Sequence, residues 1–313
     1  MHIQQAIDDF LLYLEVEQNY SANTVRSYDY DLTVFVQFLE RHKRSMELDS
    51  LNPSLIRRYV QDQMMNHNTK PRTMQRRIST LKSFSKFCAK ENVIQGDFMV
   101  GIKAPKSDSK LPTYMNMDEL KKLFAYLEHD ESGLARRNET MIKLLATTGM
   151  RRQELVDLTW EQIDFYNETI RIYGKGKKER LLPLHSIIIP LLKAHKESLK
   201  EYQTHPKEPI FYNKNGQRLN PRGLHKIFKE TLKKAGLPPT RFSLHHLRHT
   251  FSTLLLQGNK ASESVIDDVT NDGYKVDLKT LQELLGHESL ATTQVYTHID
   301  FDSKKKAIDS FRF

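Results

Sequence analysis

A polar stretch at residues 101–112 constrains how this chain of 313 residues can fold. It reads Gly-Ile-Lys-Ala-Pro-Lys-Ser-Asp-Ser-Lys-Leu-Pro, which is rich in lysine, is interrupted by proline and has no apolar period. Segments of this composition connect domains, because they favour neither a regular element nor a buried face. The sequence therefore predicts two lobes, 1–105 and 114–313. A linker at 106–113 would let the two lobes close around a binding partner.

Four amphipathic helices account for the N-terminal lobe. Apolar side chains recur every three or four residues in 3–14, in a segment that begins near Ser21, in one that begins at Pro53, and in 71–90. This period keeps one side of a helix apolar, and a polar residue or a proline at the start is typical of a helix N-terminus. The lobe is therefore predicted to be a four-helix domain.

The segment 71–90 also has a basic side. A rotation of about 100° per residue places a set of polar side chains opposite the apolar ones. This set consists of Arg72, Arg76, Thr80, Ser83 and Lys86. It can dock on a phosphate backbone, although a basic side that is merely solvated is the alternative. Phe87 lies among the polar positions, where it could contact another protein.

The C-terminal lobe is predicted to be mainly α-helical with a small antiparallel β-sheet. Strand signals occur at 162–165, 169–173 and 179–184, and the sequence Gly-Lys-Gly-Lys-Lys at 174–178 joins the last two into a basic hairpin. Helical periodicity predicts helices at 118–127, 134–147, 150–158, 186–202, 222–235, 243–258, 277–285 and 289–298. A short amphipathic tail follows.

Charge and composition favour a polyanionic partner. Lysine and arginine outnumber acidic residues by 48 to 39, which gives a net charge of +9. An ordinary basic surface is the alternative, because net charge does not say where the charges lie. The single cysteine, Cys88, cannot form an internal disulfide, and the chain shows neither a signal peptide nor an apolar run of about 20 residues. We expect a cytoplasmic protein without a membrane segment.

The chain carries side chains suited to phosphoryl transfer. Covalent cleavage of a phosphodiester needs a nucleophilic oxygen, cations on the non-bridging oxygens and an acid for the leaving oxygen. Candidates for these roles are the nucleophile Tyr296, the cations Arg151 and Arg248, the histidines His245 and His287, and Lys175 as the acid.

The same residues allow other interpretations. His245 and His249 lie one helical turn apart and could bind zinc, but we find no third ligand. An acidic stretch that begins at Asp268 has some features of a calcium loop, yet it lacks acidic side chains at two required positions. Tyr296 could be a core tyrosine on a helix face. Tyr274 is a poor nucleophile, because its acidic surroundings would repel phosphate.

Five motifs follow one another along the chain. They are Thr-Gly-Met-Arg-Arg-Gln-Glu-Leu at 148–155, Gly-Lys-Gly at 174–176, His-His-Leu-Arg-His at 245–249, Leu-Gly-His at 285–287, and Tyr296. Together they resemble the tyrosine recombinase (phage integrase) family, especially its Xer-type members. The resemblance implies an N-terminal SAM-like core-binding domain and a C-terminal catalytic domain. It also implies a site-specific recombinase that cleaves and rejoins DNA through a 3′-phosphotyrosyl intermediate, with neither cofactor nor metal.

The resemblance assigns roles residue by residue. The family arginine falls on Arg151 rather than Arg152, because only Arg151 has glutamate at +3 and leucine at +4. Glu154 is then expected to orient a catalytic group, and the His-x-x-Arg motif falls on His245 and Arg248. The other assignments are structural roles for His246 and His249, the hairpin lysine Lys175, the His/Trp position His287 and the nucleophile Tyr296.

The resemblance also implies the partners. Double-stranded DNA is the expected substrate, and exchange between two duplexes requires four protomers in this family. We therefore expect a homotetramer on two DNA sites, in which the tail 301–313 docks on a neighbour through Ile308 and Phe311. A related recombinase or an accessory protein could be a further partner. The side chains expected to contact DNA are Thr24, Arg26, Arg72, Thr73, Arg76, Ser83, Lys86, Lys177, Arg222, Lys226 and Arg241.

Two other functions remain open from the sequence. A type IB-like DNA topoisomerase would use the same side chains but would rejoin the same strand. A non-catalytic DNA-binding accessory protein would not need the complete set. The segment 259–276, which is longer than the connection in similar recombinases, separates the helix of Arg248 from Tyr296. We expect it to affect how the nucleophile is placed or which partner it meets.

Overall fold

The computed structural model describes residues 1–107, 113–174, 179–199, 205–257, 284–285 and 308. The chain separates into two compact units, Met1–Lys110 and Leu111–Phe313. Each unit has a hydrophobic core of its own. The two are described one at a time, as the N-terminal unit and the C-terminal unit.

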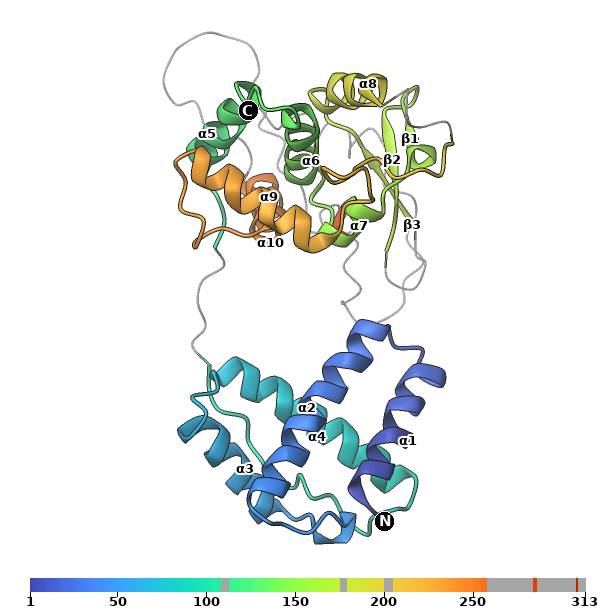
Figure 1. Cartoon of the computed structure of the whole chain (residues 1–313), viewed down its shortest axis with the longest axis vertical. Helices are drawn as coiled ribbons and strands as arrows, with labels where there is room; N and C mark the ends of the chain where they lie inside the picture. The colour runs from blue at the N-terminus through green and yellow to red at the C-terminus, as the bar shows by residue number, and fades with distance from the viewer. Residues whose placement is uncertain (108–112, 175–178, 200–204, 258–283, 286–307, 309–313) are drawn as a thin grey trace. The chain divides into compact units, whose positions relative to one another are not determined.

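Four α-helices form the N-terminal unit (Figure 1): α1 (Ile3–Val16), α2 (Ala22–Arg41), α3 (Pro53–Met65) and α4 (Pro71–Lys90). As the sequence predicts, α3 and α4 each begin with a proline. Helix α4 contacts each of the other three, so its apolar side forms the centre of the unit.

Phe87 is buried, so the prediction that it is available to another protein is wrong. Its ring centroid lies 5.3 Å from that of Phe10 and 5.0 Å from that of Tyr13, both on α1. Helix α1 therefore packs against part of the side of α4 that the periodicity assigns to solvent, as well as against its apolar side. A helical wheel cannot show this second neighbour, because it treats each helix in isolation.

The described part of the C-terminal unit contains six α-helices with defined bounds and a short 3-10 helix at Trp160–Gln162. The α-helices are α5 (Met117–Glu128), α6 (Ala135–Thr148), α7 (Arg152–Asp157), α8 (Ile188–Ser198), α9 (Pro221–Lys234) and α10 (Leu244–Gln257). Helix α6 contacts α5, α7, α8 and α10, so it is the central helix of the unit (Figure 1). The predicted helix at 289–298 lies outside the described residues, as does the predicted helix at 277–285 except for Leu284 and Leu285.

A three-stranded antiparallel sheet lies beside these helices. Its strands are β1 (Ile163–Asp164), β2 (Thr169–Tyr173) and β3 (Glu179–Pro183), in the order β1-β2-β3. In the β2–β3 hairpin, Ile172 pairs with Arg180 and Ile170 with Leu182. The predicted fold class, mainly α-helical with a small antiparallel sheet, is therefore confirmed. The tip of the hairpin at 175–178 is outside the described residues.

Gly149 ends α6 at the point where this helix meets α10. Its backbone is left-handed, with a φ of +60°. A Cβ at this position would lie 3.0 Å from Cε1 of Phe251 and 3.1 Å from Cδ2 of Leu285. Only glycine combines this conformation with so close an approach.

Two further segments join the core of the C-terminal unit. Leu284, Leu285 and Ile308 are all buried in it. Among the helices that the structure describes, none combines the length and the apolar character needed to cross a bilayer.

Candidate active site

Arg151 stands at the start of α7, two residues after the glycine that ends α6. It is the N-cap residue, and its backbone N–H donates to Oε2 of Glu154 at 2.7 Å. Nη1 of the Arg151 side chain donates to Oε1 of the same carboxylate at 2.9 Å. Glu154 thus binds both the backbone and the side chain of Arg151, and it orients a guanidinium group that is 43% exposed.

Arg180 on β3 is the second partner of Glu154. Its Nη1 and Nη2 donate to Oε1 and Oε2 of Glu154 at 3.0 and 2.7 Å. Burial pushes the pKa of Glu154 up, but the hydrogen bonds and charge of Arg180, together with the hydrogen bonds from Arg151, outweigh it and hold this pKa below its ordinary value. The carboxylate is therefore ionised at neutral pH and is shared by two arginines.

Arg248 on α10 is almost entirely buried. Its Nη1 donates to the carbonyl oxygen of Gly149 and its Nη2 to that of Leu285, both at 2.6 Å. The pKa of Arg248 is lowered to about 10. Burial is the main cause, and the positive charges of Arg151 and Arg180 add to it. Arg248 thus stays charged at neutral pH and connects α10 with the end of α6 and with Leu285.

His245 and His249 face each other one turn apart on α10. Their ring centroids are 4.5 Å apart in an edge-to-face arrangement. Desolvation lowers the pKa of both rings, and the charge of Arg248 lowers each further. The charge of Arg151 also lowers the pKa of His245, so these two groups lie within electrostatic reach. Both imidazoles are therefore neutral at pH 7, and His245 can accept a hydrogen bond or a proton.

His246 has a different place in the helix. Its Nδ1 accepts a hydrogen bond at 3.2 Å from the backbone N–H of Ser243, just before α10 begins. Within the described part of the chain, no group of three His, Cys, Asp or Glu side chains is arranged to hold a metal ion.

The structure thus brings together four of the residues that the sequence singles out, namely Arg151, Glu154, His245 and Arg248. It adds Arg180, which the sequence analysis missed. The remaining candidates, Lys175, Lys177, His287 and Tyr296, lie outside the described residues, as does the segment 259–276.

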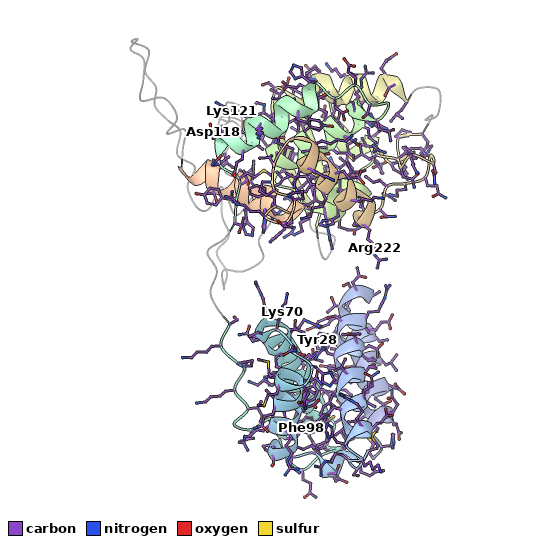
Figure 2. The ribbon with its side chains drawn as sticks, turned by 60° about the vertical axis from the view of Figure 1, so that its left-hand side comes forward. Tyr28, Lys70, Phe98, Asp118, Lys121 and Arg222 are labelled. Atoms are coloured by element: carbon purple, nitrogen blue, oxygen red, sulfur yellow. The ribbon has the colours of Figure 1, made fainter. Side chains whose placement is uncertain are left out.

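The N-terminal unit presents basic side chains along α2 and α4. Arg26, Arg72, Arg76 and Lys86 are exposed, and Thr24, Thr73 and Ser83 are half-buried. A hollow of about 380 Å³ lies between the two helices, lined by Thr24, Tyr28 and Arg76 among others. Figure 2 labels Tyr28 on α2 and Lys70 at the start of α4.

Two polar residues of α4 bind a buried aspartate instead of facing outward freely. Nη1 of Arg76 donates to Oδ2 of Asp31 at 2.6 Å, and Oγ1 of Thr80 donates to the same oxygen at 3.0 Å. Thr80 is buried, so its predicted place on the outer, basic side is wrong. The reason is that Asp31 of α2 lies inside the helix pair and needs hydrogen-bond donors there.

The predicted DNA contacts of the C-terminal unit lie on α9 and just before α10. Arg222 and Lys226 are exposed on α9, and the Arg222 side chain extends from the surface of the unit (Figure 2). Nη1 of Arg241 donates to Oε1 of Glu119 on α5 at 2.7 Å, although its side chain remains 51% exposed. All three cations are therefore accessible to a polyanion.

A mainly α-helical unit that gathers two arginines, a histidine and an orienting glutamate has the cations and the polar groups that a phosphate-binding site needs. The "Phage integrase, N-terminal SAM-like domain" matches residues 7–92, and the "Phage integrase family" domain matches residues 113–271. The chain belongs to the phage integrase family, whose members are the tyrosine recombinases.

The relatives found by sequence are Xer recombinases. The chain is 31% identical to tyrosine recombinase XerD of Oceanobacillus iheyensis, over 95% of this chain and 94% of that protein. It is 33% identical to tyrosine recombinase XerC of Anoxybacillus flavithermus, over 94% of this chain and 92% of that protein. The solved structure of the XerH site-specific recombinase bound to its palindromic difH substrate, a post-cleavage complex, has a TM-score of 0.68 and 25% identity. The match covers 87% of this chain and 75% of that one.

These matches confirm the activity predicted from the sequence. The chain is a site-specific tyrosine recombinase, an enzyme that breaks and rejoins DNA strands. They do not favour a topoisomerase or a non-catalytic accessory protein.

Proposed function

We propose that Tyr296 attacks a DNA phosphodiester, forms a 3′-phosphotyrosyl bond and releases a 5′-hydroxyl. In the second half of the reaction, the 5′-hydroxyl of a partner strand attacks this linkage and restores Tyr296. The covalent intermediate conserves the energy of the bond, so the cycle needs no ATP. The observation that carries the proposal is the convergence of Arg151, at the start of α7, with His245 and Arg248 of α10, from two stretches of sequence that lie far apart in the chain.

Each of these groups has a part in the proposed reaction. The exposed guanidinium of Arg151 binds a non-bridging oxygen of the scissile phosphate directly. The buried charge of Arg248 stabilises the additional negative charge of the transition state, and burial strengthens its effect. His245, which is neutral before DNA binds, accepts a proton or donates a hydrogen bond. Lys175 is proposed to protonate the leaving 5′-oxygen, and His287 to hydrogen-bond the phosphate.

The nucleophile is tested on a nicked suicide DNA, from which the short fragment that carries the released 5′-hydroxyl diffuses away. Without this hydroxyl the strand cannot be rejoined, so the covalent adduct is trapped. We expect wild-type enzyme to accumulate adduct and Tyr296→Phe to form none, because phenylalanine lacks the attacking oxygen. Tyr274→Phe is the matched control and should react normally. An adduct that persists in Tyr296→Phe would refute the assignment.

We further propose that the recombinase acts as a homotetramer on two DNA sites and exchanges its tail between protomers. Ile308 is buried in the core of its own C-terminal unit. An exchanged tail would place the same side chain in the equivalent site of a neighbour, as in domain swapping, with little change in buried area.

Deletion of residues 301–313 tests the exchange. We expect the truncated protein to bind a single DNA site but to lose the tetrameric two-site complex, as measured by native gel electrophoresis and by sedimentation. Ile308→Ala should weaken the complex less than the deletion does. A truncated protein that forms the tetramer normally would contradict the proposal.

A further inference from the structure

Arg180 links three parts of the C-terminal unit through one guanidinium group. Nη1 and Nη2 hold the two oxygens of Glu154 on α7, as described above, and Nε donates to the carbonyl oxygen of Leu284 at 3.1 Å. The side chain is 11% exposed and comes from β3, next to the hairpin tip. All three of its nitrogen atoms are therefore engaged.

A second arginine holds the neighbouring carbonyl. Nη2 of Arg248 donates to the carbonyl oxygen of Leu285 at 2.6 Å, so two consecutive carbonyl groups bind two guanidinium groups from different elements. Carbonyl groups near a helix C-terminus lack intrahelical donors, and cationic side chains stabilise them. The sequence predicts that a helix ends at Leu285, which explains why these two oxygens accept from arginines.

The place of Leu284 in the sequence gives this contact its importance. His287 and then Tyr296 follow Leu285 along the chain. Arg151, which is proposed to bind the scissile phosphate, is oriented by the same Glu154 carboxylate that Arg180 binds. One guanidinium group therefore relates the phosphate-binding arginine to the backbone that leads to the nucleophile.

We propose that Arg180 is a positioning residue of the recombination reaction, which fixes the Leu284 carbonyl relative to the Glu154–Arg151 pair and so sets where the chain that carries His287 and Tyr296 begins. Its three nitrogen atoms are engaged by Glu154 and Leu284, so the proposed role is exerted through these two residues. This role rests on the proposed function, because it takes Tyr296 as the nucleophile. Lysine cannot replace the arginine, since a single ammonium group cannot match both carboxylate oxygens and the carbonyl in the geometry of the fork.

The test uses full-length Arg180→Lys, which retains the positive charge beside Glu154. Arg171→Lys is the matched control, because Arg171 lies on the adjacent strand β2 with a side chain that is 57% exposed. The measurements are the dissociation constant for a single DNA site, the urea midpoint of unfolding, and the rate of adduct formation on nicked suicide DNA at saturating enzyme.

For Arg180→Lys, we expect the dissociation constant and the urea midpoint to stay close to those of the control. The rate of adduct formation should fall by a factor on the order of 10², because a displacement of about 1 Å can cost this much. Its dependence on pH should parallel that of wild type, since no proton donor or acceptor is removed. Arg180→Lys reacting at the wild-type rate would overturn the proposal. The proposal would also be overturned if Arg180→Lys weakened DNA binding by the same factor as it slowed adduct formation.

A second variant covers the case in which Arg180→Lys lowers the urea midpoint. In Glu154→Gln/Arg180→Gln neither buried group keeps an unpaired charge. Glu154→Gln alone is assayed beside it, because this change also removes the partner of Arg151, and the double variant should form adduct more slowly than Glu154→Gln at saturating DNA. Tyr296→Phe is assayed beside both variants. An adduct in Tyr296→Phe would refute the proposed nucleophile, whereas a wild-type rate in the Arg180 variants would refute only the positioning role.

Discussion

Glu154 carries a negative charge that is 7% exposed and is bound by two arginines, so its ionisation is linked to stability. Because the pKa of Glu154 in the folded protein lies below its ordinary value of 4.5, folding favours the carboxylate form. The resulting stabilisation is present above pH 4.5 and is lost as the pH falls through the lower, folded-state pKa.

We therefore predict that Glu154→Gln lowers the free energy of unfolding by about 3 kcal/mol at neutral pH, since it leaves Arg180 without its carboxylate. The difference from wild type should shrink as the pH is lowered below 4.5, through the folded-state pKa of Glu154. Urea unfolding at several pH values measures it. Glu161→Gln, at an exposed position nearby, is the control. A difference that does not change with pH would contradict the linkage.

The sequence identifies the residues of this site that belong to short motifs, but not the residue that connects them. Arg151 and Glu154 are three positions apart and His245 and Arg248 share one helix, so their spacing reveals them. Arg180 is 26 positions from Glu154 and 104 from Leu284, and no periodic pattern reports such distances. The available signal was an arginine on a strand of the hairpin, two positions before the buried Leu182, where alternation would otherwise give the position to a core residue.

At the scale of single elements, α4 shows what helical periodicity captures and what it omits. Its bounds, 71–90, agree with the prediction, because proline marks its start and the apolar period is unbroken. The burial of Phe87 and Thr80 was missed, since it depends on α1 and on Asp31 of α2. Arg72, Lys82 and Lys86 are exposed basic residues of α4 that no described carboxylate binds, and the sequence analysis assigned two of them, Arg72 and Lys86, to DNA contacts.

We predict that Arg72 and Lys86 contact DNA phosphates. Arg72→Gln and Lys86→Gln should each weaken DNA binding to a similar degree on any sequence. Each should also reduce the slope of log K against log salt by about 1, because one fewer counterion is released. Binding is measured by fluorescence anisotropy over a range of salt concentrations. Arg58→Gln, which removes an exposed arginine of α3, should leave the slope unchanged. Equal slopes for all three variants would contradict this assignment.

For the whole molecule, the decisive property is that the two units have separate cores. No residue of the described chain belongs to both. Independent cores linked by a polar segment unfold as separate cooperative units.

We therefore predict two transitions in scanning calorimetry. Gly149→Ala should lower the Tm of only one transition, by roughly 5–10 °C, because it combines a strained backbone with overlap against Phe251. Phe84→Ala, in the core of the N-terminal unit, should lower only the other. Gly216→Ala is a control with a similar φ of +73° and open space around it. A single transition shifted by both core variants would contradict the prediction.

The burial of Ile308 ties completion of the C-terminal core to a late step in the synthesis of the chain. Ile308 belongs to the same core as Leu284 and Leu285, whose carbonyl groups the two arginines hold. A nascent chain that ends before residue 308 exposes the surface that this side chain covers, although Arg151 and Arg248 have already been made. Cotranslational folding can therefore complete this core only after residue 308 has left the ribosome.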